Sequence, residues 1–287
     1  MTNHIIEARH LRKSYQPGKP VLDDVGFTIG AGRIVGLMGP NGAGKTTALK
    51  AILGLTAFEG ELRVLGHDPR TQRDRLMQEI CFIADVAVLP KWLRVAQALD
   101  YVDGVHPRFD RSRAEAVLAR TDVGMRARIG ELSKGMTTQL HLALIMAIDA
   151  KLLILDEPTL GLDLLYRRTF YDTLLNDYFD RERTILVTTH QVEEIEHLLT
   201  DVLFIDRGRI VLDAAVETLP ERFVQVVTNS THASAARALG PIDEREVFGR
   251  IAMTFENRRA DELASFGETR IPSIADLFVA KMQGARR

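Results

Sequence analysis

Three observations on the 287-residue chain predict an α/β fold built around a parallel sheet. The first is a series of short apolar runs of strand type, of which the clearest lie at 33–38, 152–155 and 184–187. The second is that segments with apolar residues three and four apart, the pattern of a helix, lie between these runs. The third is that chemically useful residues directly follow each run. Strands that alternate with helices form parallel sheets, which hold their ligands at the carboxyl ends of the strands.

Length and composition indicate a folded chain with room for one large core and a small appendage. The formal net charge is −2 and there is no long basic block, which argues against nucleic acid as the main partner. No run of about 18 apolar residues occurs, and the first residues do not resemble a signal peptide. We therefore expect a cytoplasmic protein. The single cysteine, Cys81, lies in an apolar strand-like run, where a buried and unreactive thiol is expected.

Residues 39–47 are the most informative segment. They read Gly-Pro-Asn-Gly-Ala-Gly-Lys-Thr-Thr and fit the phosphate-binding pattern G-x-x-x-x-G-K-[ST]. Glycines let such a loop curl until its amides point at anionic oxygens, the lysine adds a positive charge, and the threonine hydroxyl suits magnesium. A plain glycine-rich turn is the alternative, but the strand before and the helix after the loop favour a bound nucleoside triphosphate. The residues assigned to the nucleotide are Gly39, Asn41, Gly42, Gly44, Lys45, Thr46 and Thr47.

Further polar residues follow the other two runs. Asp156 is placed to hold magnesium, and Glu157 to position or deprotonate an attacking water. An acidic pair at a strand end is common as simple surface polarity, so this interpretation depends on the phosphate loop upstream. His190 ends the third run; a histidine there is usually structural, but beside a γ-phosphate it could donate a hydrogen bond. Tyr15 is either an ordinary packing residue or a platform for an adenine ring.

The pattern changes after Pro220. Before it, residues 92–130 have helical spacing, and a long helix is expected to begin at Ser133, a residue suited to cap a helix N-terminus. After it, strand-like and helix-like segments suggest a small α+β unit. We therefore expect a nucleotide-binding domain over residues 1–219 and an accessory domain over residues 220–287.

Together, these motifs resemble those of the nucleotide-binding subunits of ATP-binding-cassette (ABC) transporters. Gly39–Thr47 looks like the Walker A loop, Leu152–Glu157 like Walker B, Leu160-Gly-Leu-Asp163 like the D-loop and His190 like the switch histidine. Leu132-Ser-Lys-Gly-Met136 stands where the family signature, usually Leu-Ser-Gly-Gly-Gln, is found. Motifs in this order and at this spacing are far more specific than a phosphate loop alone.

The resemblance implies a P-loop ATPase with a β layer, a parallel-sheet core, a helical subdomain and a small C-terminal appendage. It implies a head-to-tail dimer, either a homodimer or a heterodimer with a related ATPase, that holds ATP and Mg²⁺ between its subunits. The site residues that it adds are Tyr15 as the adenine platform, with Ser133, Gly135 and Asp163 from the signature and the D-loop. It also implies a peripheral position on the inner face of the cell membrane, bound to a separate permease. The signature variant and the appendage resemble the exporter subfamily.

Two positions depart from the family pattern. Lys134 and Met136 replace the usual glycine and glutamine of the signature, but Ser133 and Gly135 are retained. Asp85 stands where the family has a glutamine that contacts magnesium and the attacking water. A carboxylate can bind the metal but, when ionised, cannot donate a hydrogen bond. Asp85 is therefore assigned to the metal, with a local loop cap as the alternative.

Permease docking is expected between the 80–95 segment and the helical region, with Trp92 and Leu93 as contacts, although Trp92 could instead be ordinary core. The rival function is an ABC ATPase without a permease, associated with translation or DNA. Such translation factors carry two cassettes, whereas this chain has one. The DNA-repair proteins insert a long coiled coil before the signature, and no sustained heptads occur here.

Overall fold

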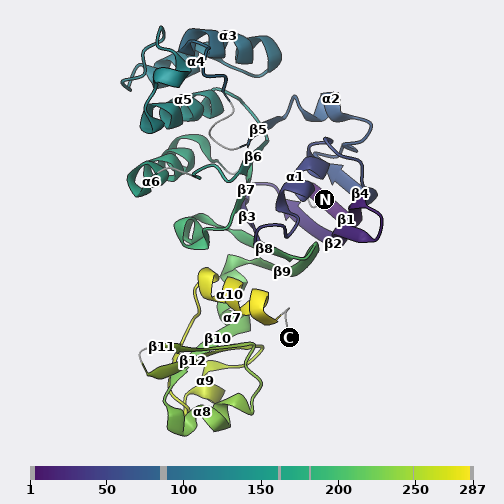
Figure 1. Ribbon diagram of the computed structural model, residues 1–287, viewed down its shortest axis with the longest axis vertical. Coiled ribbons are helices and arrows are strands. Elements are labelled where there is room, and N and C mark those ends of the chain that lie inside the picture. Colours follow the sequence, from purple (N-terminus) through teal and green to yellow (C-terminus); the bar gives the residue numbers. More distant parts are fainter. Residues whose placement is uncertain (1–3, 85–88, 161–162, 181, 248, 285–287) are drawn as a thin grey trace.

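The computed structural model describes residues 4–84, 89–160, 163–180, 182–247 and 249–284 (Figure 1). Its central sheet has the strand order β5-β6-β7-β3-β8-β9, in which neighbours pair in parallel except for β9, which is antiparallel to β8. The parallel sheet expected from the sequence is thus confirmed. The strands are β5 (Ile80–Ala84), β6 (Leu152–Asp156), β7 (Thr184–Thr189), β3 (Ile34–Met38), β8 (Asp201–Asp206) and β9 (Arg209–Ala215).

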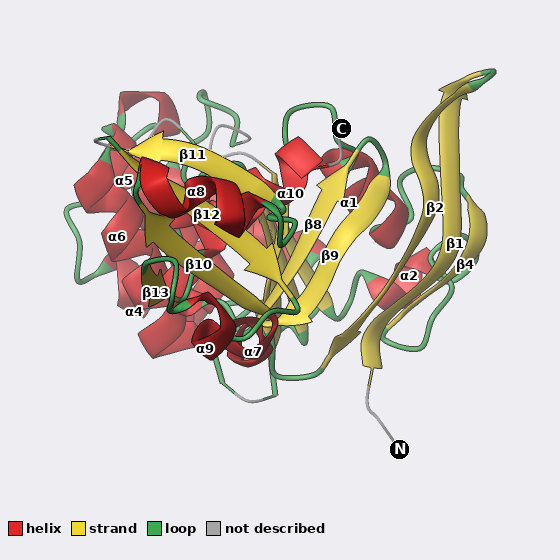
Figure 2. Cartoon of the chain, turned by 90° about the horizontal axis from the view of Figure 1, so that it is seen from below, coloured by secondary structure: helices red, strands yellow, loops and turns green. Residues whose placement is uncertain are grey.

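A second, antiparallel sheet covers one side of the molecule in the order β2-β1-β4. Its strands are β1 (His4–Gln16), β2 (Lys19–Gly30) and β4 (Glu59–Val64), and the chain then forms α2 (Arg73–Leu76). Figure 2 shows this sheet standing apart from β8 and β9. Helix α1 (Lys45–Ile52) packs between the two sheets, where Leu49 and Ile52 join Leu22 of β2 and Leu37 of β3 in one buried cluster.

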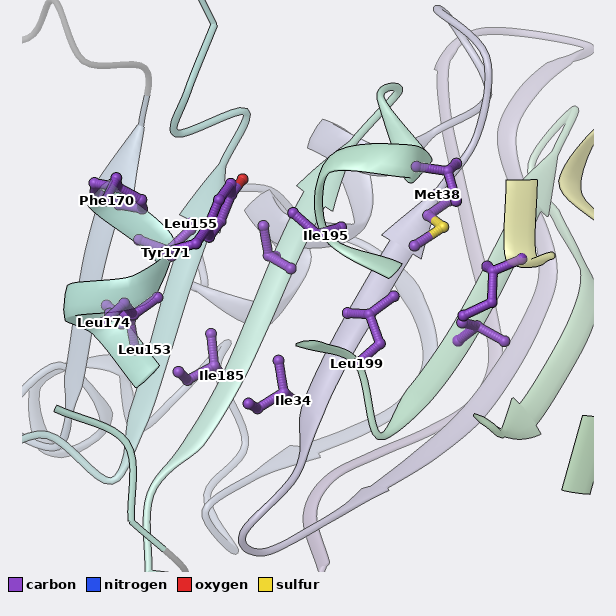
Figure 3. Packing of buried hydrophobic residues seen from close by; sticks show 14 of the residues in the cluster. Ile34, Met38, Leu153, Leu155, Phe170, Tyr171, Leu174, Ile185, Ile195 and Leu199 are labelled. Carbon is purple, nitrogen blue, oxygen red and sulfur yellow. The ribbon is translucent and has the colours of Figure 1, made fainter. Parts of the chain in front are cut away.

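Helices cover the opposite face of the central sheet. They are α6 (Leu164–Thr173), the π-helical turn η2 (Leu174–Tyr178) that continues it, and part of α5 (Lys134–Met146). Figure 3 shows Phe170, Tyr171 and Leu174 against the side chains of Leu153 and Leu155 from β6. Since α1 and α6 pack on opposite faces, the elements that begin with the phosphate loop and with the D-loop residues lie on either side of β6.

The helical region forms a smaller cluster of its own. It consists of α3 (Val95–Val105), α4 (Arg111–Leu118), the short turn η1 (Ile129–Glu131) and the outer face of α5. Helix α5 begins as expected, because the Ser133 Oγ accepts a hydrogen bond from the Met136 amide at 3.2 Å. Cys81, on β5, is buried, and burial raises the pKa of its thiol to about 12.

The C-terminal residues form a third sheet, antiparallel, in the order β11-β12-β10-β13. The turns η3 (Val192–Glu194), η4 (Glu196–Leu198) and η5 (Val216–Thr218) precede it in the chain. The sheet and its helices are α7 (Leu219–Arg222), β10 (Phe223–Thr228), α8 (Ser230–Arg237), β11 (Asp243–Val247), β12 (Arg250–Glu256), α9 (Ala260–Leu263), β13 (Glu268–Arg270) and α10 (Ile274–Gly284). No helix in the described ranges is both long enough and apolar enough to cross a membrane.

Helix α10 joins the third sheet to the central one (Figure 1). On one side, Lys281 pairs with Glu256 of β12 at 2.8 Å and Asp276 pairs with Arg245 of β11 at 2.6 Å. On the other side, the ring of Phe278 packs edge-on against Phe204 of β8, with 5.4 Å between the ring centres. The last helix of the fold is therefore part of the main core.

Candidate active site

The phosphate loop fills the turn between β3 and α1. Its backbone passes so close to neighbouring segments that two of its glycines have no room for a side chain. A Cβ on Gly39 would lie 2.4 Å from the carbonyl oxygen of Ile205. Gly44, with φ of +113°, would place a Cβ 2.8 Å from the carbonyl oxygen of Val21. The tight curl that the sequence pattern predicts is therefore held in place by β2 and β8.

Lys45 is the first residue of α1 and is buried, with 7% of its surface exposed. Its ammonium donates a hydrogen bond to the carbonyl oxygen of Gly39 at 2.6 Å and lies 3.8 Å from the Glu157 carboxylate. Burial lowers the pKa of Lys45, against the opposing effect of the charges on Glu157 and Asp156. The loop thus closes around one positive charge that faces two carboxylates.

Asp156 ends β6 with its two carboxylate oxygens in different contacts. One accepts a hydrogen bond of 2.5 Å from the Thr188 hydroxyl, and the other lies 3.5 Å from the Thr46 hydroxyl. Thr188 was not singled out from the sequence. The available signal was its place two residues before His190, at the end of the strand next to β6, since the parallel register sets Asp156 opposite Thr188.

Glu157 follows Asp156 with φ of +49°, in the left-handed region that non-glycine residues rarely adopt. Its amide donates to the carbonyl oxygen of Thr188 at 3.1 Å, which fixes the turn. Its carboxylate lies between Lys45 and His190, with the His190 Nδ1 at 2.9 Å. The structure thus brings together residues from the ends of three elements, and it holds Glu157 in a backbone conformation that aims the carboxylate into this group.

Tyr15 does not pack in the core: its surface is 57% exposed, and the Lys13 ammonium lies 4.9 Å from its ring centre. Burial is the largest single influence on the pKa of its phenol and raises it, but hydrogen bonds with Thr47 and Thr56 and the charges of Lys50 and Lys13 together outweigh it, so the net pKa lies below the ordinary value. The contact with Thr47 sets Tyr15 beside the start of α1. Asn41 is exposed on the phosphate loop.

Ser133, Gly135 and Asp163 lie apart from this group, at the starts of α5 and α6. Ser133 and Asp163 each cap their helix, and the Asp163 carboxylate accepts from the Tyr166 amide at 3.1 Å. Gly135 is buried in the first turn of α5. Asp85, assigned to the metal from the sequence, lies outside the described residues.

The chain is similar to known proteins both in sequence and in fold. The family described as ABC transporter matches residues 22–160. Nod factor export ATP-binding protein I of Rhizobium johnstonii is 36% identical over 223 residues, which cover 75% of this chain and 71% of that protein. The chain belongs to the ABC transporter family. As an ABC ATP-binding protein, it binds ATP and hydrolyses it to power transport.

Other relatives agree with this membership in the ABC family. The ABC transporter ATP-binding protein YtrB of Bacillus subtilis is 26% identical over 295 residues, which cover 99% of this chain and all of that protein. A solved structure of an ATP binding subunit of an ABC transporter has the same fold, with a TM-score of 0.66 at 24% identity over 75% of this chain and 91% of that one. The relation to YtrB extends through the C-terminal sheet.

This ABC protein also has an apolar cleft of about 330 Å³ between β5 and the helices α3 and α5. Val105, at its rim, is 62% exposed. Trp92, just before α3, is 74% exposed and so does not belong to the core, while Leu93 is half-buried against the helical cluster. The interpretation of Trp92 as ordinary core is therefore wrong.

Proposed function

We propose that the protein works as a dimer that closes on two Mg-ATP molecules and drives export through a separate membrane permease. The observation that carries the proposal is the convergence of Lys45, Asp156, Glu157 and His190 around the phosphate loop. A buried cation, a loop of amides and a positioned carboxylate are what phosphoryl transfer to water requires. Family membership indicates that the reaction is ATP hydrolysis, and these four residues have the chemical groups that this reaction needs.

In this proposal, each residue has one role. Lys45 binds the β- and γ-phosphates, and the amides of the loop and of the first turn of α1 surround them. Glu157 accepts a proton from the attacking water or orients it, and His190 donates a hydrogen bond to the γ-phosphate. In the structure, His190 instead contacts Glu157 at 2.9 Å, so nucleotide would replace this contact. Tyr15 stacks on the adenine.

Magnesium fits the site because the Thr46 hydroxyl and an Asp156 oxygen lie 3.5 Å apart. Hydroxyl and carboxylate oxygens, completed by phosphate oxygens and water, are the ligands that Mg²⁺ takes in nucleotide sites. When bound, the metal would neutralise phosphate charge during transfer. Thr188 holds the other Asp156 oxygen at 2.5 Å and so fixes the orientation of the carboxylate.

The second half of each ATP site would come from the partner subunit. Ser133 and Gly135 begin α5, where free amides and the positive end of the helix dipole suit a γ-phosphate. Asp163 would face the same interface from the start of α6. Because these residues lie across the central sheet from the phosphate loop, one copy does not use both halves on the same nucleotide.

We also propose that the chain divides into two domains, residues 1–219 and 220–287. Helix α10 belongs to the second domain and packs against both.

We expect hydrolysis by the purified protein to require Mg²⁺ and to rise faster than in proportion to protein concentration, because each active unit contains two copies. Phosphate release is measured at several protein concentrations, in magnesium and in EDTA. A rate strictly proportional to protein concentration, over a range in which the protein is mostly monomeric, would contradict the dimer. Undiminished activity in EDTA would contradict the metal site.

The cleft between β5 and the helices α3 and α5 is proposed as the permease docking site, with Trp92 beside it. The relatives named for Nod factor export support the direction of transport, and family membership supports a place on the inner face of the membrane.

Val105→Asp would bring an unpaired carboxylate into the apolar contact, so we expect permease binding to weaken about tenfold or more. Val247→Asp, at another exposed valine on β11, is the control.

The measurement uses membrane vesicles that contain a candidate permease, a membrane protein co-expressed with this chain. The fraction of protein retained on them should fall for Val105→Asp and stay at the wild-type level for Val247→Asp. Equal retention of all three proteins would place docking elsewhere. If wild-type protein were not retained at all, the ATPase without a permease would become the better interpretation.

A further inference from the structure

Tyr166 makes an unusually close contact with the signature segment. A Cβ placed on Gly135 would lie 2.2 Å from two ring carbons of Tyr166 and 2.6 Å from its hydroxyl oxygen. The ring therefore rests directly on the Gly135 backbone, in space that any other residue at position 135 would need. The signature helix α5 and the helix α6 meet at this contact.

The surroundings of Tyr166 are those of a surface, not of the core. Tyr166 is 36% exposed, and its neighbours Leu164 and Leu165 are 77% and 72% exposed. The same turn is capped by Asp163, whose carboxylate accepts from the Tyr166 amide at 3.1 Å. One short segment therefore carries Asp163, an exposed apolar surface and a ring seated on Gly135.

We propose that Tyr166 is a positioning residue that links the Asp163 turn to the phosphate-binding turn of Gly135. The inference rests on the proposed dimer, in which Gly135 of one copy contacts ATP held by the other. The ring fills the space beside the Gly135 backbone, so the two turns cannot move closer together unless Tyr166 leaves its present rotamer. A shift of the Asp163 turn would therefore move the first turn of α5 with it. The signature residues of a subunit would therefore contact the partner's ATP only when the Asp163 turn of the same subunit has the position seen in the structure.

The test uses the Glu157→Gln protein, which is expected to bind ATP but to hydrolyse it slowly, and measures dimer formation in Mg-ATP by sedimentation. Tyr166→Ala should weaken dimer formation by about 10- to 100-fold, because a two-fold dimer contains the contact twice. Tyr166→Phe keeps the ring and should dimerise like its parent. Tyr101→Ala, at a 65% exposed tyrosine of α3, is the matched control and should have no effect.

Affinity of the monomer for ATP separates positioning from general damage. The phosphate loop packs on the other face of the sheet, so Tyr166→Ala should leave ATP affinity and the melting temperature near those of the parent. A parallel loss of ATP affinity and thermal stability would show a merely structural role and overturn the assignment.

A second pair of variants tests the contact itself. Gly135→Ala forces the ring away and displaces the α5 turn as well, so it should weaken dimer formation more than Tyr166→Ala does. Combining the two changes removes the overlap, so the double variant should dimerise better than Gly135→Ala alone. If the double variant dimerised no better than Gly135→Ala alone, the contact between Tyr166 and Gly135 would not couple the two turns, and the assignment would be wrong. If the Glu157→Gln parent formed no dimer in Mg-ATP, the proposed dimer would fail first, and this assignment with it.

Discussion

Replacing Glu157 by glutamine is expected to lower ATP hydrolysis about 10²- to 10⁴-fold while leaving ATP binding intact. Glutamine keeps the size of the side chain and an oxygen that can face His190 or Lys45, but its amide cannot accept a proton. The residue also keeps its left-handed backbone turn, since the hydrogen bond from its amide to Thr188 is unchanged. With hydrolysis blocked, the closed dimer should accumulate in Mg-ATP.

Phosphate release and size-exclusion chromatography in Mg-ATP measure these two effects on one preparation. Glu182→Gln, at an exposed glutamate just before β7 and so at the opposite end of that strand from Thr188, is the control for the loss of a negative charge. If Glu157→Gln hydrolysed ATP at the wild-type rate, Glu157 would not be the general base, and another residue would have that role. Loss of ATP binding together with turnover would instead indicate that Glu157 supports the phosphate loop through Lys45.

Lys45→Ala is expected to weaken ATP binding about 10- to 100-fold, the effect of losing a charge-assisted hydrogen bond. The structure adds a second reason for a large effect. Lys45 is the cation beside Glu157, at 3.8 Å, and its charge also acts on Asp156. Without this charge, the two carboxylates would repel the phosphates more strongly, so the loss should be greatest when magnesium is absent.

Calorimetric titration with ATP, in magnesium and in EDTA, measures both parts of this effect. Lys19→Ala, at the exposed hairpin between β1 and β2, removes the same charge from the surface and should bind ATP like the wild type. Thermal melting of each variant shows whether the fold is intact. Unchanged ATP affinity in a folded Lys45→Ala protein would contradict the assignment of the phosphate loop.

Features that are encoded locally could be predicted from the sequence. The phosphate loop, the strand that precedes it and the helix start at Ser133 each depend on residues next to one another, and the structure has all three. The parallel order of strands followed from their alternation with helices, which set Asp156 and His190 at one edge of the sheet. Family membership then followed from several motifs in sequence order, which no single motif would have shown.

Features that depend on register and packing could not be predicted. Thr188 holds Asp156 because β6 and β7 align at that position, and nothing in either strand alone specifies the alignment. The ring of Tyr166 on Gly135 requires the relative placement of two helices. Trp92 illustrates the opposite error: large aromatic side chains are mostly buried, but this one is 74% exposed.

Ribosomes deliver a chain from its N-terminus, so α10 is synthesised after every other element of the fold. Yet Leu277 of α10 shares a buried cluster with Leu212 of β9 and with Phe204, which the ring of Phe278 covers. Until α10 emerges, this apolar face of the nascent protein stays open to water. The buried cluster around Phe204 is therefore complete only after α10 has been synthesised. The residues of the C-terminal sheet have to be synthesised first. During that interval the growing chain exposes an apolar surface that a chaperone could cover.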